Sequence, residues 1–211
     1  MIALLDYGSG NLRSVAKAVE KMGGDVKITQ RPEEAMQANY MILPGVGAFA
    51  DCRRNLEAAN LLEPVEHHIR AGKPFLGICV GMQLLYTTSH EFGCHPGLNH
   101  IPGQVIPFAT TMVDPADDKR HLKVPHMGWN KVRQQQPHPL WQGIPDESHF
   151  YFVHSFHCQP EENSTVAAIS EYGIPFVAAA CKDNIFATQF HPEKSQRLGL
   201  KLLENFLSWQ P

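Results

Sequence analysis

Residues 74–86 read Pro-Phe-Leu-Gly-Ile-Cys-Val-Gly-Met-Gln-Leu-Leu-Tyr, an apolar run that passes through a cysteine into a helical pattern. Gly77 and Gly81 flank Cys79 at −2 and +2, the spacing of a nucleophile elbow with Cys in place of Ser. A tight strand-to-helix turn strains its central residue, and only glycine fits close on either side. The helix start favours thiolate over thiol. Cys79 is therefore the candidate nucleophile, and the alternative is an ordinary buried cysteine.

Short apolar runs alternate with helical patterns through the first half of the chain. Strands are predicted at 2–5, 26–29, 40–43 and 75–78, and helices at 12–22, 31–39, 51–62 with a further stretch to 69, and 80–86. This alternation predicts an α/β fold whose parallel sheet is covered by helices on both faces. Ligands bind such sheets at the carboxyl ends of the strands.

The second half carries β-like runs punctuated by Pro and Gly. They lie at 105–106, 149–153, 166–169, 176–180 and 185–190, and predict an antiparallel or mixed extension of the sheet within one domain, 1–211. Residues 110–121 are polar and charged, which predicts an exposed loop. The chain ends on an amphipathic helix that Ser195 is expected to cap.

Composition excludes several classes of protein. The 211 residues are 43% hydrophobic, and 18 Lys and Arg face 21 Asp and Glu for a net charge of −3. Nucleic acid and membrane are therefore poor partners. Five scattered cysteines and a start without a basic leader favour a cytoplasmic protein without disulfides. Cys94, His95 and His100 fit no zinc spacing, so we expect no metal site.

A second motif supplies what a thiolate nucleophile lacks, a proton carrier and a group that orients it. His191-Pro192-Glu193 follows the predicted strand 185–190. In an extended tripeptide His191 and Glu193 share a face, so Glu193 can hold one ring nitrogen while the other faces Cys79. A surface turn is the alternative. His154 and His157 are candidates to line a pocket without transferring a proton.

The sequence also offers donors for an oxyanion, the charge that develops when a carbonyl is attacked. The amide of Val80 directly follows the nucleophile. Pro44-Gly45-Val46-Gly47 leaves a buried strand, and its glycines allow the peptides of Val46 and Gly47 to point inward or to flip. The alternative is an ordinary strand-to-helix turn.

A cysteine elbow with a late His-x-Glu resembles the class I glutamine amidotransferases. The resemblance continues in order through residues 6–12, 44–49, 81–83, 125–130, 151–156 and 191–195. Within the family these segments are most similar to subunits that supply ammonia to a separate cyclase in histidine biosynthesis. Residues 110–123 are longer and more charged than the family pattern, and we interpret them as a surface insertion.

The resemblance implies a flavodoxin-like α/β fold with a mixed, mainly parallel sheet and helices on both faces. It implies that Cys79 is the nucleophile, His191 the general base and acid, and Glu193 its orienting acid, with L-glutamine as substrate and no cofactor. It also implies the residues that hold the amino-acid end of glutamine, namely Gln83, Glu91 and backbone groups near Ser155 and Phe156.

The resemblance further implies a partner, a cyclase subunit that folds as a (β/α)8 barrel and forms a heterodimer with this chain. The resemblance implies activation by this partner, so we expect the free subunit to be a poor glutaminase. A peptide turned the wrong way between Gly45 and Gly47 would leave the oxyanion without one donor. A thiol peptidase, a binding module without chemistry, and an amidotransferase that feeds another acceptor are the alternatives.

Overall fold

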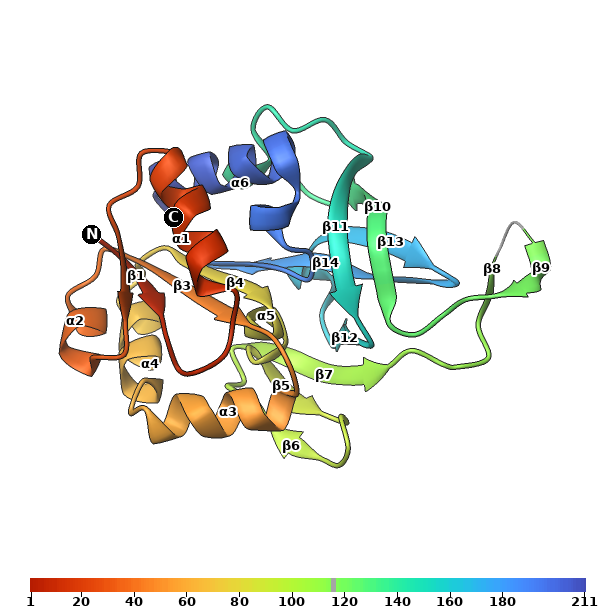
Figure 1. The fold of residues 1–211 in the computed structure, drawn as a ribbon, viewed down its shortest axis with the longest axis horizontal. Helices are drawn as coiled ribbons and strands as arrows, with labels where there is room; N and C mark the ends of the chain where they lie inside the picture. The colour runs from red at the N-terminus through yellow and green to blue at the C-terminus, as the bar shows by residue number, and fades with distance from the viewer. Residues whose placement is uncertain (115–116) are drawn as a thin grey trace.

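The computed structural model describes residues 1–114 and 117–211. A sheet of nine strands runs through the described part of the chain (Figure 1), in the order β11-β10-β13-β14-β15-β4-β3-β1-β2. The strands are β1 (Ile2–Leu5), β2 (Val26–Thr29), β3 (Tyr40–Gly45), β4 (Phe75–Cys79), β10 (His126–Gln134), β11 (Ser148–His154), β13 (Val166–Tyr172), β14 (Ile174–Lys182) and β15 (Ile185–Thr188).

One half of this sheet is parallel and the other antiparallel. Strands β2, β1, β3, β4 and β15 pair in parallel, and β1, β4 and β15 are buried at every residue, as expected where helices cover both faces. From β15 onward the pairings to β14, β13, β10 and β11 are antiparallel. The predicted α/β fold is confirmed, although parallel pairing is less dominant than we expected.

Helices cover both faces of the parallel half. They are α1 (Leu12–Lys21), α2 (Pro32–Met36), α3 (Phe49–Ala58), α4 (Leu62–Arg70), the short α5 (Val80–Gln83) and α6 (Gln196–Ser208). Figure 1 shows α1 and α6 together on one face, and α3 and α4 on the other. No helix in the described ranges is long and apolar enough to cross a bilayer.

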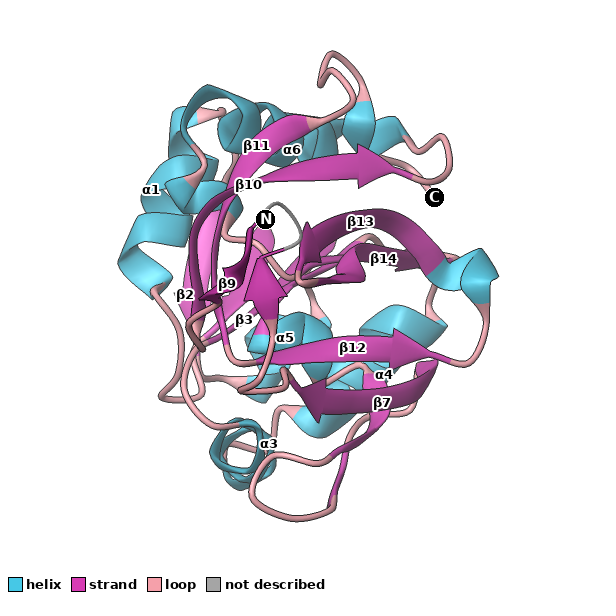
Figure 2. Ribbon diagram, turned by 90° about the vertical axis from the view of Figure 1, so that its right-hand side faces the viewer, coloured by secondary structure: helices cyan, strands magenta, loops and turns pink. Residues whose placement is uncertain are grey.

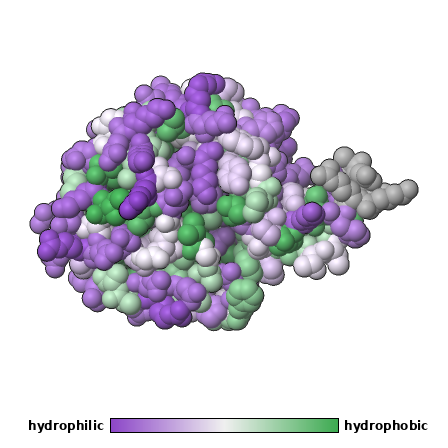
Figure 3. Space-filling view, in the orientation of Figure 1, coloured by the Kyte–Doolittle hydropathy of each residue, from purple (hydrophilic) through white to green (hydrophobic). Residues whose placement is uncertain are grey.

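A smaller sheet lies beside the large one, as the turned view in Figure 2 shows. Its order is β12-β7-β5-β6, with β12 (Phe156–Pro160), β7 (Ile101–Pro107), β5 (Tyr86–Ser89) and β6 (His95–Pro96). Strands β8 (Val113–Asp114) and β9 (Asp117–His121) pair as a hairpin that projects from the body. The surface in Figure 3 is largely hydrophilic, with apolar residues in small separate patches.

Several sequence predictions are wrong in detail. The helix expected at 80–86 ends at Gln83, because Tyr86 turns into β5. The helix expected at 51–62 ends at Ala58, shortly before Asn60 takes a positive φ of 57°, and the further stretch to 69 is a separate helix, α4. The loop expected at 110–121 contains the hairpin β8–β9, apart from 115–116, which lie outside the described residues. Strand β10 was not predicted, because His126–Gln134 is polar at most positions, and β12 was not predicted either.

Candidate active site

The candidate site lies where three neighbouring parallel strands end. Strand β4 ends at Cys79, β3 ends beside it at Gly45, and β15 on the other side ends at Thr188, three residues before His191. The carboxyl ends of parallel strands meet at one edge of a sheet, which is where α/β proteins bind ligands. The topology thereby brings together residues that are more than a hundred positions apart.

The turn at Cys79 has the strain expected of a nucleophile elbow. Cys79 has φ 56° and ψ −113°, a conformation that side chains rarely adopt. A Cβ at Gly81 would lie 1.9 Å from the carbonyl oxygen of Leu43, and one at Gly77 would lie 2.9 Å from that of Gly81. Both glycines are thus required by the close approach of backbone. Helix α5 has only four residues, so its dipole contributes less than the sequence suggested.

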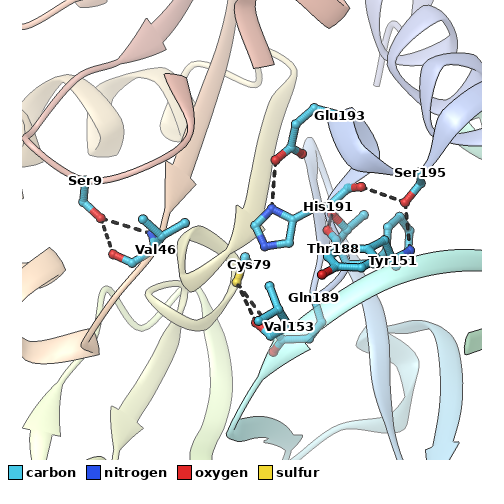
Figure 4. A network of polar contacts seen from close by, with 11 residues as sticks. Ser9, Val46, Cys79, Tyr151, Val153, Thr188, Gln189, His191, Glu193 and Ser195 are labelled. Atoms are coloured by element: carbon cyan, nitrogen blue, oxygen red, sulfur yellow. Dashed lines mark hydrogen bonds and ion pairs between the residues drawn. The ribbon is translucent and has the colours of Figure 1, made fainter. Parts of the chain in front are cut away.

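His191 and Glu193 meet beside this turn, and Figure 4 shows the imidazole lying between the Cys79 sulfur and the Glu193 carboxylate. His191 Nδ1 is 2.9 Å from Glu193 Oε1, and the two side chains are only 2% and 1% exposed. We expected an extended tripeptide here, but Pro192–Lys194 forms a 3-10 turn. The turn, rather than a strand, places the carboxylate against the ring.

The site favours the protonated form of His191. Burial lowers the pKa of its ring, but hydrogen bonding and charge from Cys79 and Glu193 outweigh burial and raise that pKa to about 10. Ring nitrogen Nε2 is buried and has no well-aligned hydrogen-bond partner among the described residues. An imidazolium facing a sulfur in a dry site stabilises the thiolate.

Ser195 fixes the backbone that carries His191. Its hydroxyl donates to the carbonyl of His191 at 2.7 Å and accepts the N–H of Tyr151 at 3.0 Å. The N–H of His191 also donates to the carbonyl of Tyr151 at 3.0 Å. Ser195 stands at the N-cap position of α6, yet its side chain makes no cap bond. The predicted cap is therefore wrong, and Ser195 ties the histidine to β11 instead.

The three predicted oxyanion donors lie in one cleft, but the Val46 amide is already hydrogen-bonded elsewhere. Val46, Gly47 and Val80 all line the cleft that contains Cys79. The N–H of Val46, however, donates to Ser9 Oγ at 3.1 Å, and the same hydroxyl donates to the carbonyl of Val46 at 2.5 Å. Figure 4 shows this pair of bonds on the side away from Cys79. The Val46 amide is thus occupied and cannot donate to an oxyanion in this conformation.

Two predicted substrate-binding side chains also lie in the cleft, and both make internal contacts. Gln83 Nε2 donates to the carbonyl of Phe156 at 3.3 Å and to Gln189 Oε1 at 3.0 Å. Glu91 is buried, and its Oε2 accepts the N–H of Phe49 at 2.5 Å, at the first residue of α3. Acceptor oxygens on Gln83 and Glu91 suit the ammonium group of an amino acid.

A cleft of about 540 Å³ collects nearly all the residues that the sequence singled out. Apart from Glu193, which lies behind the imidazole, its lining includes each predicted catalytic, oxyanion and substrate-binding residue: Val46, Gly47, Cys79, Val80, Gln83, Glu91, Ser155, Phe156 and His191. Of the two other histidines predicted to line a pocket, His154 lines this cleft and His157 lines a separate groove. A larger open groove of about 1080 Å³ holds Cys158 instead. Burial raises the pKa of the Cys158 thiol far above its usual range, so that cysteine stays protonated.

Comparison with known proteins identifies the family. Residues 3–209 match the glutamine amidotransferase class-I family. The chain belongs to the class I glutamine amidotransferases. It is 52% identical to the imidazole glycerol phosphate synthase subunit HisH of Syntrophotalea carbinolica, over 98% of each chain. It is 53% identical to that of Geobacter metallireducens, over 97% of this chain and 96% of the relative.

Solved structures agree on the fold of this amidotransferase. A crystal structure described as a glutamine amidotransferase superposes with a TM-score of 0.73 at 17% identity, covering 98% of this chain and 97% of that one. A putative GMP synthase protein from Thermoplasma acidophilum gives 0.68 at 22% identity, over 98% and 92%. These likenesses confirm the predicted fold class.

Sequence reasoning missed two polar residues of the site. Gln189 is fully buried, and its Nε2 lies 3.7 Å from Cys79 Sγ. A glutamine at the end of a buried apolar strand, two positions before His191, was the available signal. Ser9 was also missed, since only the tertiary structure shows that its hydroxyl reaches Val46.

Proposed function

We propose that this amidotransferase is the glutaminase subunit of imidazole glycerol phosphate synthase. It hydrolyses L-glutamine to glutamate and ammonia, and delivers the ammonia to a cyclase subunit, the (β/α)8 barrel HisF, for imidazole glycerol phosphate formation in histidine biosynthesis. Residues 1–211 act as one domain of a cytoplasmic heterodimer. The observation that carries the proposal is the Cys79–His191–Glu193 arrangement in a chain that matches HisH subunits along its length.

Cys79, His191 and Glu193 carry the chemistry. The thiolate of Cys79 attacks the side-chain carboxamide carbon of glutamine, and the carbonyl oxygen takes up negative charge. His191 gives its proton to the departing nitrogen, the C–N bond breaks, and ammonia leaves a thioester on Cys79. His191 then takes a proton from water, whose oxygen attacks the thioester and releases glutamate. Glu193 holds the imidazole in the tautomer that both steps need.

The oxyanion donors make the activity dependent on the partner. Val80 donates from the elbow. The second donor is the N–H of Val46 once the Gly45–Val46 peptide turns toward Cys79, or that of Gly47 once the Val46–Gly47 peptide turns. Ser9 holds both peptides in their present direction. One missing donor costs about 10²–10³ in rate. Docking of the cyclase turns the peptide, and the free subunit is therefore a poor glutaminase.

A Cys79→Ala chain tests the proposal. Mixed with the cyclase, its nucleotide substrate and glutamine, this variant should give no turnover, while turnover with added ammonia should match that of the wild-type complex. Loss of both activities, or retention of glutamine-dependent turnover, refutes the assignment. Release of glutamate by the wild-type chain at equal rates with and without cyclase and nucleotide refutes partner dependence, and faster cleavage of peptides than of free glutamine indicates a peptidase.

A further inference from the structure

Two histidines outside the triad form a buried pair next to the cleft. His126 begins β10 and His154 ends β11, and the two residues are register partners in the antiparallel pairing. Their rings lie on the inner face, where His126 Nδ1 is 2.9 Å from His154 Nε2. The residues are 3% and 6% exposed. Neither takes part in the chemistry proposed above.

Aromatic packing fixes both rings in place. His126 stacks between Phe152 and Tyr172, with ring centroids 5.1 and 4.1 Å away. His154 packs against Phe108 and Phe176 at 5.1 and 5.0 Å. Rings held from two sides in a densely packed cluster cannot rotate freely, so their nitrogens have fixed partners.

The partners determine where each proton sits. His154 Nδ1 lies 2.8 Å from the carbonyl oxygen of Phe156, which can only accept, so Nδ1 carries the hydrogen. In the neutral ring Nε2 is then bare and accepts from His126 Nδ1. The bare Nε2 of His126 accepts from Asn130 Nδ2 at 3.3 Å. The amide of Asn130 is itself oriented, because Nδ2 also donates to the carbonyl of Glu171 at 2.8 Å.

Burial keeps the pair neutral, as this arrangement requires. Burial lowers the pKa of His154 to about 3, with a further contribution from neighbouring histidines, and lowers the pKa of His126 to about 4. At neutral pH each ring therefore donates one hydrogen bond and accepts one. The chain of hydrogen bonds from Asn130 through His126 and His154 to the carbonyl of Phe156 is therefore complete, and each donor in it points toward Phe156.

The hydrogen-bond chain ends on the carbonyl of Phe156, a residue of the cleft lining. It accepts from His154 and also from Gln83 Nε2. The second hydrogen on Gln83 Nε2 goes to Gln189 Oε1. With both hydrogens committed, Gln83 Oε1 is the atom left for a ligand, and an oxygen acceptor fits the α-ammonium of glutamine rather than its carboxylate.

We propose that His126 and His154 are positioning residues for glutamine binding, which fix the carbonyl of Phe156 so that Gln83 presents its side-chain oxygen to the substrate ammonium. The inference rests on the proposed glutaminase function and extends it to two residues outside the triad. His154 also lines the cleft, but the pair acts on binding and not on bond breaking, since its hydrogen bonds lead to Gln83 and not to Cys79.

Steady-state kinetics of the complex with the cyclase tests this role. His154→Phe preserves the ring shape and removes the donor, so KM for glutamine should rise about 5- to 10-fold, the effect of losing one hydrogen bond, with kcat within about twofold. His154→Asn keeps a donor near the position of Nδ1 and should recover most of the affinity. His157→Phe is the matched control. This buried histidine packs on the same Phe108, with ring centroids 4.7 Å apart, but takes no part in the hydrogen-bond chain, so the KM of this variant for glutamine should stay unchanged.

Nitrogen NMR of histidine-labelled protein provides a readout that does not depend on activity. Both rings should appear as neutral Nδ1–H tautomers at pH 7, in contrast to the Nε2–H form that dominates in free histidine. An Nε2–H or charged His154 overturns the proposal, as does a His154→Phe enzyme that folds with unchanged KM or with a loss confined to kcat. A wild-type complex that cannot hydrolyse glutamine refutes the proposed function instead. In that case the NMR tautomers of His126 and His154 still show whether the two rings are hydrogen-bonded as described.

Discussion

Glu193 shows how one buried side chain sets the chemistry of its neighbour. Its carboxylate is nearly inaccessible and lies 2.9 Å from His191 Nδ1. In so dry a site the charge is poorly screened by solvent, so it both orients the ring and favours its protonated form. The sequence indicated the pairing of His191 with Glu193, while the depth of burial that gives it strength comes from the packing of α6 and β11 around it.

Replacing Glu193 with Gln removes the charge and keeps the shape. We expect glutamine hydrolysis in the complex to fall by about 10²- to 10⁴-fold, because the imidazole loses the acid that fixes its tautomer. Alkylation of Cys79 by iodoacetamide at neutral pH should slow in parallel, since the imidazolium that stabilises the thiolate is weakened. Glu204→Gln, which breaks an exposed pair with Lys201 on α6, is the control. Unchanged rates in Glu193→Gln would show that Glu193 has no orienting role.

At the scale of elements, hydrogen bonds tie the loop after β3 to the turn before α1. This loop carries the peptide that we propose as an oxyanion donor. Ser9 lies before α1 and holds both the N–H and the carbonyl of Val46. Cys52 on α3 approaches the same carbonyl at 3.4 Å. The loop is thus fixed by three modest hydrogen bonds, two to one hydroxyl and one to a thiol, which a docked partner can exchange for others.

Ser9→Ala should free the Val46 amide. Because one hydrogen bond is worth about 1 kcal/mol, we expect basal glutamate release by the isolated subunit to rise about fivefold, with little change in the complex. Ser9→Thr keeps the hydroxyl and serves as the control. Basal activity that stays the same in Ser9→Ala, measured as glutamate formed without cyclase, would mean that Ser9 does not restrain the peptide.

Burial of the His154 ring where β10 pairs with β11 lowers its pKa and so makes stability depend on pH. The pKa of His154 is lowered from 6.5 to about 3, so between these values the unfolded chain binds a proton that the folded chain lacks. The free energy of unfolding therefore falls as the pH falls below about 6.5. We expect His154 to contribute a loss on the order of 1–2 kcal/mol between pH 7 and pH 5.

Urea unfolding at the two pH values checks this contribution. His154→Phe should lose less stability on acidification than the wild type. His149, an exposed histidine on the same strand, gives the matched control as His149→Asn. An identical pH dependence in wild type and His154→Phe would contradict the buried neutral state.

At the scale of the whole molecule, the antiparallel half of the sheet turns an apolar outer face to solvent beside the cleft. Met127 and Trp129 on β10 are 62% and 46% exposed. Their register partners Val153 and Tyr151 continue this face toward Cys79, whose sulfur lies 4.0 Å from the carbonyl of Val153. Large apolar side chains that are exposed beside a cleft are typical of a surface that binds a partner protein.

Trp129→Glu should weaken binding of the cyclase by about 10- to 100-fold, because tryptophans dominate the affinity of protein interfaces. Ile28→Glu is the control, since Ile28 is 41% exposed on β2 at the opposite edge of the sheet. Titration calorimetry measures both affinities, and equal losses in the two variants would place the interface elsewhere.

The sequence by itself determined the parallel half of the sheet and the identity of the candidate triad. Its strands are short apolar runs between turn residues, and Gly77, Cys79 and Gly81 have a spacing that local sterics impose. Strand β10 escaped prediction, since its inner face carries His126, Gly128 and Asn130, of which His126 is buried and the other two are half-buried in a sheet formed by long-range pairing. Only the tertiary structure decided that Ser9 holds Val46, that Ser195 anchors His191, and that His126 meets His154. Each of these contacts joins residues far apart or redirects a side chain from a local role, and no local pattern encodes which distant partner a polar atom will find.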